Sequence, residues 1–146
     1  MGNVTPLRDV YPDIPTTEME TPMDAQTMLR TAIVLLAITA LGGLLMAGLR
    51  FSGRPTPPNP VAMLHGLLAA SGLTLILYAA FTAGLPGGGW LGLVLLLAAV
   101  LGGLVLNLRY HWERLELPIW LVLVHAAVAV AGFLVLAISV WNVGAR

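Results

Sequence analysis

Residues 61–83 read VAMLHGLLAASGLTLILYAAFTA, and this run sets the class of fold. It contains no arginine, lysine, aspartate or glutamate, and it is long enough for an α-helix to cross a bilayer, which takes about 20 mainly apolar residues. Three further mainly apolar stretches lie at about 29–50, 88–108 and 118–141. The chain is therefore predicted to be an all-α polytopic membrane protein with four transmembrane helices, which form a four-helix bundle.

The composition agrees with this class and excludes others. Hydrophobic residues make up 58% and charged residues 10% of the 146 residues, outside the usual mix of a soluble domain. The absence of cysteine excludes disulfides and thiolate metal sites. The chain has no lysine and no basic run, so a nucleic acid is an unsuitable partner and the lipid bilayer is the expected one.

Residues 1–28 differ from the rest of the chain. They carry five carboxylates and four prolines and show no helical or strand periodicity. We interpret them as an acidic, proline-rich extramembrane tail that is extended or dependent on a partner. They contain no apolar core of a signal peptide, so the first helix is expected to act as an uncleaved anchor.

The membrane domain, residues 29–141, contains an internal repeat. A shift of sixty residues places the Leu-Gly-Gly-Leu of 41–44 on that of 101–104, Pro58 on Pro118, and His65 on His125. The repeats are residues 29–84 and 88–144. Each contains two helices, so both enter the membrane in the same direction, and we predict two parallel two-helix repeats related by an axis along the membrane normal.

The two histidines are the main functional candidates. An ionisable side chain inside a membrane helix is costly and indicates a functional site. Both lie seven residues beyond the repeated proline, about 10 Å along the helix. Small residues four and seven positions later share their helix face, and paired glycines of the neighbouring helices lie at similar depth. This pattern predicts one haem b, a flat macrocycle with two axial imidazoles, held between the second and fourth helices. The predicted binding residues are His65 and His125 as metal ligands, with Ala69, Gly72, Ala129, Gly132, Gly43 and Gly103 around them.

The arginines give an orientation and a candidate anion site. Two connections on one side hold Arg50, Arg54, Arg109 and Arg114, so by the distribution of positive charge this side is expected to be cytoplasmic. Both termini are then non-cytoplasmic, in what we expect to be a bacterial inner membrane. Arg54 and Arg114 are candidates to pair with haem propionates. His111 is explained by the aromatic and cationic belt at the membrane interface, or alternatively by a quinone site.

The two histidines are also compatible with roles that involve no haem. Small residues at helical spacing serve helix packing as well, and a histidine can hydrogen-bond across a helix interface without any cofactor. A chlorophyll-type pigment could use the same histidines, one ring on each. Paired intramembrane carboxylates are absent from the spans, which argues against a proton-coupled carrier, and no proline lies at their centres to mark a broken-helix substrate site.

In its four spans and in His65 and His125, the chain resembles small membrane b-type cytochromes, such as the cytochrome b561-like group. The resemblance implies an electron-transfer subunit without catalysis of its own, working with further membrane subunits and with quinone as a candidate partner. Members of that group commonly carry two haems on four histidines, whereas this chain has two intramembrane histidines. The nearer analogue is a single-haem subunit of a respiratory or related complex. The alternatives are a cofactor-free structural accessory subunit and a pigment-binding subunit of a photosynthetic assembly.

Overall fold

The computed structural model describes residues 24–143, and the tail predicted for residues 1–28 lies outside them except for its last five residues. The elements, in chain order, are the α-helices α2 (Ala25–Phe51), α3 (Asn59–Thr82) and α4 (Gly89–Val105), the π-helix η1 (Leu106–His111), and the α-helix α5 (Ile119–Val143). Four helical segments are long and apolar enough to cross a membrane, with α4 and η1 counted as one. This confirms the predicted all-α membrane bundle.

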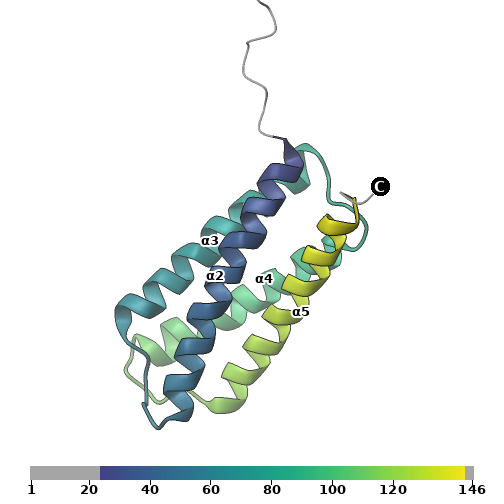
Figure 1. Cartoon of the computed structure of the whole chain (residues 1–146). Coiled ribbons are helices and arrows are strands. Elements are labelled where there is room, and N and C mark those ends of the chain that lie inside the picture. The colour runs from purple at the N-terminus through teal and green to yellow at the C-terminus, as the bar shows by residue number, and fades with distance from the viewer. Residues whose placement is uncertain (1–23, 144–146) are drawn as a thin grey trace, which may run out of the picture.

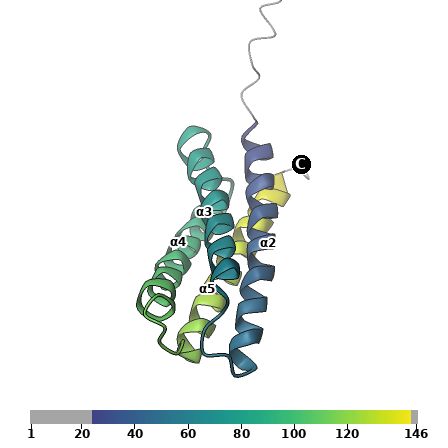
Figure 2. The same ribbon diagram turned by 90° about the vertical axis from the view of Figure 1, so that its left-hand side faces the viewer.

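The four helices lie side by side and have two common ends (Figures 1 and 2). At the terminal end, α2 begins, α5 finishes, and residues 83–88 connect α3 to α4. At the loop end lie the connections 52–58 and 112–118. Two parallel two-helix repeats produce this arrangement, because each repeat starts at the terminal end, turns at the loop end and returns.

Local sequence accounts for most helix boundaries. The carboxylate of Asp24 accepts a hydrogen bond from the backbone N–H of Gln26 at 3.4 Å, which caps the start of α2. Pro58 precedes α3 and Pro60 lies in its first turn, where a proline costs no helical hydrogen bond. Gly84 follows α3 with a φ of +80°, a conformation that glycine adopts without strain.

The end of the third span differs from the prediction. A loop was expected from residue 109, but the chain remains helical through His111, with the last six residues as η1. The wider π-helical bonding is visible where the N–H of Trp112 meets the carbonyl of Asn107 at 2.7 Å. The corresponding end of α2 is ordinary α-helix. The two repeats are therefore locally different at their loop ends.

Packing is strongest within each repeat and at the terminal end. α2 packs along α3 and α4 along α5, whereas between the repeats the main contact is α2 with α5. The buried core gathers in the half of the bundle near the termini and consists of Leu29, Ala32, Ile33, Leu36, Ile76, Ala79, Ala80, Leu93, Leu96, Leu136 and Val140. In the loop-side half, every residue of 40–51, 59–71 and 119–131 is at least partly exposed, and in 100–111 only Leu106 is buried. The repeats are thus joined firmly at one end and loosely at the level of the histidines.

Candidate functional site

His65 and His125 lie at the same depth on α3 and α5. Each is six residues beyond the first residue of its helix, about 9 Å along the axis. Both side chains are partly buried, and their ring centres lie 6.4 Å apart with the ring planes at 65°. The rings therefore approach each other across the interface between the repeats.

Each histidine is held by the same hydrogen bond within its own repeat. Nδ1 of His65 lies 2.9 Å from the carbonyl oxygen of Thr39 on α2, and Nδ1 of His125 lies 2.8 Å from the carbonyl oxygen of Ala99 on α4. Thr39 and Ala99 are themselves sixty residues apart, so the repeat extends to the partner of each ring. A carbonyl oxygen only accepts, so each Nδ1 carries the proton and donates.

A glycine lies against each ring and allows this hydrogen bond. A Cβ placed on Gly43 would lie 3.1 Å from Cε1 of His65, and one on Gly103 would lie 3.1 Å from Cε1 of His125. Each glycine follows the accepting carbonyl by four residues, on the same helix face. A side chain there would push the imidazole away from its carbonyl. Gly43 and Gly103 thus make room for the histidine rings themselves, which is a different role from the predicted contact with the edge of a macrocycle.

The second nitrogen of each ring, Nε2, is the atom that remains available to a ligand. With Nδ1 protonated, Nε2 of a neutral imidazole bears a lone pair, and within residues 24–143 neither Nε2 has a hydrogen-bond partner. Pinning one ring nitrogen to a carbonyl so that the other can bind a metal is the usual arrangement of histidine ligands. The same residues contain no group of three or more histidine, cysteine or acidic side chains placed to hold a metal ion. Two imidazoles alone suit a metal whose remaining ligands belong to a bound cofactor.

The small residues on the histidine faces divide into two groups. Ala69 and Ala129 are partly exposed, one turn from each histidine. Gly72 and Gly132 are buried against the first helix of their own repeat: a Cβ on Gly72 would lie 3.1 Å from Cγ of Leu36, and one on Gly132 would lie 3.1 Å from the carbonyl oxygen of Gly92. These two glycines therefore serve helix packing, and the structure does not turn them toward the space between the histidines.

The predicted anion-binding arginines are at the loop end but on its surface. Arg54 and Arg114 are both exposed, and Arg114 has a positive φ of 56°. Of the arginines in residues 24–143, Arg50 alone is not exposed: its side chain is 11% exposed, and its Nη2 lies 2.5 Å from Oε1 of Glu116. Arg50 lies seven residues beyond Gly43 and therefore on the same helix face. This spacing was the signal in the sequence that could have identified Arg50.

His111, at the end of η1, is separate from this pair. It is partly buried, and its Nδ1 is inaccessible to solvent without a hydrogen-bond partner in residues 24–143. Nearby, Arg109 and Glu113 form an exposed ion pair one turn apart. The ring contact of His65 is with His125, so the site is a pair of histidines.

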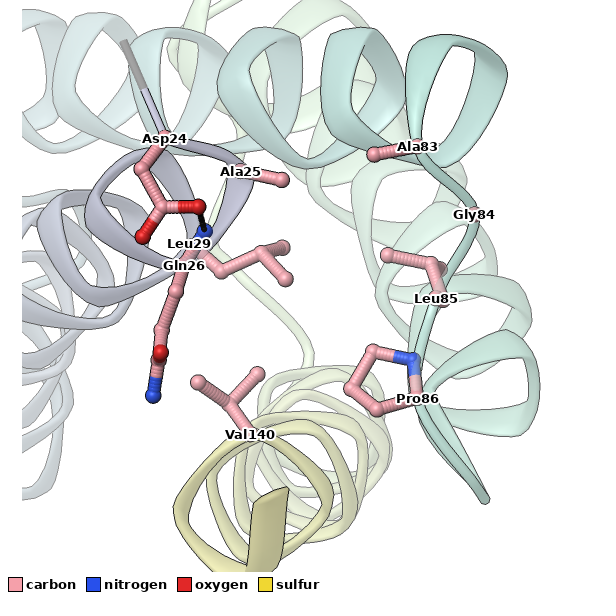
Figure 3. Close-up of a pocket in the computed structure, with 9 residues that line it drawn as sticks. All are labelled: Asp24, Ala25, Gln26, Leu29, Ala83, Gly84, Leu85, Pro86 and Val140. Atoms are coloured by element: carbon pink, nitrogen blue, oxygen red, sulfur yellow. Dashed lines mark hydrogen bonds between the residues drawn. The ribbon is translucent and has the colours of Figure 1, made fainter. Parts of the chain in front are cut away.

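A cavity of about 390 Å³ opens at the terminal end, away from the histidines. Figure 3 shows Leu29, Leu85, Pro86 and Val140 around it, with Asp24 and Gln26 at one side. Nε2 of Gln26 is inaccessible to solvent and has no hydrogen-bond partner in the described part of the chain. None of the predicted site residues lines this cavity.

Comparison of the chain with protein-family models, with curated proteins and with solved structures finds no match.

Proposed function

We propose that this chain is an integral membrane subunit that binds one haem b between α3 and α5, with His65 and His125 as axial ligands, and transfers electrons within a larger complex. The observation that carries the proposal is the pair of unpartnered Nε2 atoms, within residues 24–143, on rings whose centres lie 6.4 Å apart. With metal–nitrogen bonds of about 2 Å on either side, two imidazoles bound to one metal have their centres about 6 Å apart.

The packing around the histidines supports the same proposal. A macrocycle needs room between the repeats, and the helices pack less tightly at this level than at the terminal end: no residue of 40–51, 59–71 or 119–131 is buried, and the buried residues nearby are Thr39, Ala99 and Leu106. The hydrogen bonds to Thr39 and Ala99 would fix the orientation of both rings, as hydrogen bonds do for histidines that bind a metal. A bound haem b would supply a one-electron redox centre in surroundings of low dielectric constant.

The separation of the rings also favours one shared group over two pigments. Two macrocycles, one on each histidine, need more room than rings with centres 6.4 Å apart leave between them.

The surroundings that we propose follow from the membrane fold and the loop arginines: a bacterial inner membrane, both termini outside the cytoplasm, and further membrane subunits, with quinone as a candidate electron partner. The chain alone would lack catalysis.

A second candidate function is a cofactor-free accessory subunit. It is favoured by the fact that each Nδ1 hydrogen bond joins the two helices of one repeat, α2 with α3 and α4 with α5. Such a bond stabilises membrane helix pairs without any ligand, by about 0.6 kcal/mol on average. It uses only one nitrogen of each ring, however, and gives no reason for the two rings to lie together.

The test is a dithionite-reduced-minus-oxidised absorption spectrum of the gently purified protein. We expect a b-type α-band that is lost in both His65→Ala and His125→Ala, because one axial ligand does not hold the haem in its place. His111→Ala is the matched control and is expected to keep the band, since it removes the third histidine without touching the pair. A featureless spectrum from a haem-replete preparation would refute haem binding and favour the cofactor-free accessory subunit. Chlorophyll-type bands would instead indicate that the histidines bind a pigment.

A further inference from the structure

Arg50 occupies an unusual position at the loop end of α2. It lies seven residues beyond Gly43, on the same helix face and about 10 Å further along the axis. Gly43 is the residue against the ring of His65. Although Arg50 is close to the end of its helix, its side chain is only 11% exposed. The Arg50 side chain is therefore largely shielded from solvent at the loop end, about two helical turns beyond the glycine that lies against His65.

The hydrogen bonds of this guanidinium cross from the first repeat to the second. Nε donates to the carbonyl oxygen of Leu117 at 2.8 Å, and Nη2 donates to Oε1 of Glu116 at 2.5 Å. Beside them, the N–H of Leu117 donates to the carbonyl oxygen of Pro55 at 3.3 Å. Leu117 is buried and lies two residues before α5 begins. The first repeat thus holds the segment that leads directly into the helix of His125.

The strength of this bridge lies mainly in the bond to Leu117. Glu116 is 70% exposed, and an ion pair with one partner in solvent contributes little to stability. A rigid guanidinium that bonds to a main-chain oxygen fixes both distance and direction. In the second repeat the position equivalent to Arg50 is Tyr110, so the bridge exists once and is not duplicated by the repeat.

The bridge is the second fixed point between the repeats. The first is the buried core at the terminal end, where α2 meets α5. The histidines lie between these two points, at a level where α3 and α5 are only partly buried. If the repeats were joined only at the terminal end, the distance between the two histidine rings would depend on how far the repeats separate at the loop end.

We propose that Arg50 is a positioning residue that holds the two repeats at the separation that brings His65 and His125 to one site. The effect on haem rests on the proposed function, whereas the effect on the separation of the repeats does not. The two parts are therefore measured separately.

The separation is measured with spin labels in the full chain. Because the chain contains no cysteine, two can be introduced without background. Met63→Cys and Leu123→Cys are equivalent exposed positions on α3 and α5, two residues before each histidine. We expect Arg50→Ala to broaden the distance distribution between these labels in electron–electron double resonance. A control pair at the terminal end, Tyr78→Cys and Ile138→Cys, is expected to keep its distribution, because the core holds that end.

An unchanged distribution at 63 and 123 would overturn the proposal. Equal broadening at both pairs would also overturn it, since Arg50 would then support the bundle as a whole and not the level of the histidines. If Arg50→Ala fails to fold, Arg50→Lys carries the same test, because lysine keeps the charge but lacks the Nε donor. Arg109→Ala is the matched control, since Arg109 lies at the same end of the bundle and its side chain is 62% exposed.

The second measurement is haem retention in the same variants. We expect Arg50→Ala to lower haem affinity about tenfold, at the lower end of the range for residues that orient metal ligands, with Arg109→Ala unchanged. Retention equal to that of the unaltered chain would overturn the link between Arg50 and the site. A chain without a b-type band before any substitution refutes the proposed function instead, and the spin-label distances then decide the positioning role alone.

Discussion

The two repeats are nearly identical around the histidines and differ at the loop end. Both place a histidine six residues into a helix, direct its Nδ1 to a carbonyl of the preceding helix, and put a glycine against its Cε1. At the loop end, α2 finishes as an α-helix with the solvent-shielded Arg50, whereas α4 continues into η1, whose cation Arg109 is exposed. The features shared by the repeats are those that position the two histidine rings. The differing features belong to the bridge and to the surface.

The largest effect is expected at the glycines against the rings, where the repeats agree. We expect Gly43→Leu and Gly103→Leu each to lower haem affinity by about 10–100-fold, because the new side chain displaces the imidazole from its carbonyl partner. The measurement is the haem-to-protein ratio from the b-type α-band. Gly48→Leu is the control, since a Cβ there meets nothing within 4 Å. Loss in one repeat only would show that the two histidines are not equivalent.

A smaller effect is expected where the helices of the second repeat approach more closely than those of the first. Gly92 corresponds to Ala32, which already carries a Cβ. A Cβ on Gly92 would lie 2.9 Å from the backbone nitrogen of Leu136, which cannot move aside without the helix. Gly92→Ala should therefore lower the free energy of unfolding by about 1–3 kcal/mol.

This difference between the repeats is measurable by titrating the protein in detergent micelles with a denaturing detergent and following circular dichroism. The control is Gly66→Ala on α3, where a Cβ meets nothing within 4 Å, so that only the gain in helix propensity remains. A Gly92→Ala variant as stable as Gly66→Ala would mean that α4 and α5 pack no more tightly than α2 and α3.

The smallest effect is expected at the surface cation of the second repeat. Arg109→Ala removes an ion pair with Glu113 whose side chains are 62% and 47% exposed, so the free energy of unfolding should change by less than about 0.5 kcal/mol. Arg50→Ala, which breaks the bridge between repeats, serves as the contrasting variant in the same detergent titration. If Arg109→Ala lost as much stability as Arg50→Ala, the ion pair of η1 would have a structural role that its exposure does not predict.

Prediction from the sequence succeeded where hydropathy and register carry the information. The four spans are confirmed, and the equal depth of His65 and His125 follows from their common distance to a repeated proline. The sequence does not determine which neighbour a helix face meets. Gly72 and Gly132 share a face with the histidines, yet their nearest neighbours are residues of α2 and α4. Helical spacing identifies a face, but not what packs against it.

The order of the residues already encodes a four-helix membrane protein made of two parallel repeats, with one histidine at matched depth in each. Apolar runs must span the bilayer as helices because lipid offers no partner for the backbone, and a sixty-residue repeat fixes equal positions. The tertiary structure was needed to show that the rings meet at 6.4 Å, that each Nδ1 bonds a carbonyl, and that Arg50 joins the repeats. The rotation of each helix about its axis sets these contacts, and rotation results from the packing of all the helices together.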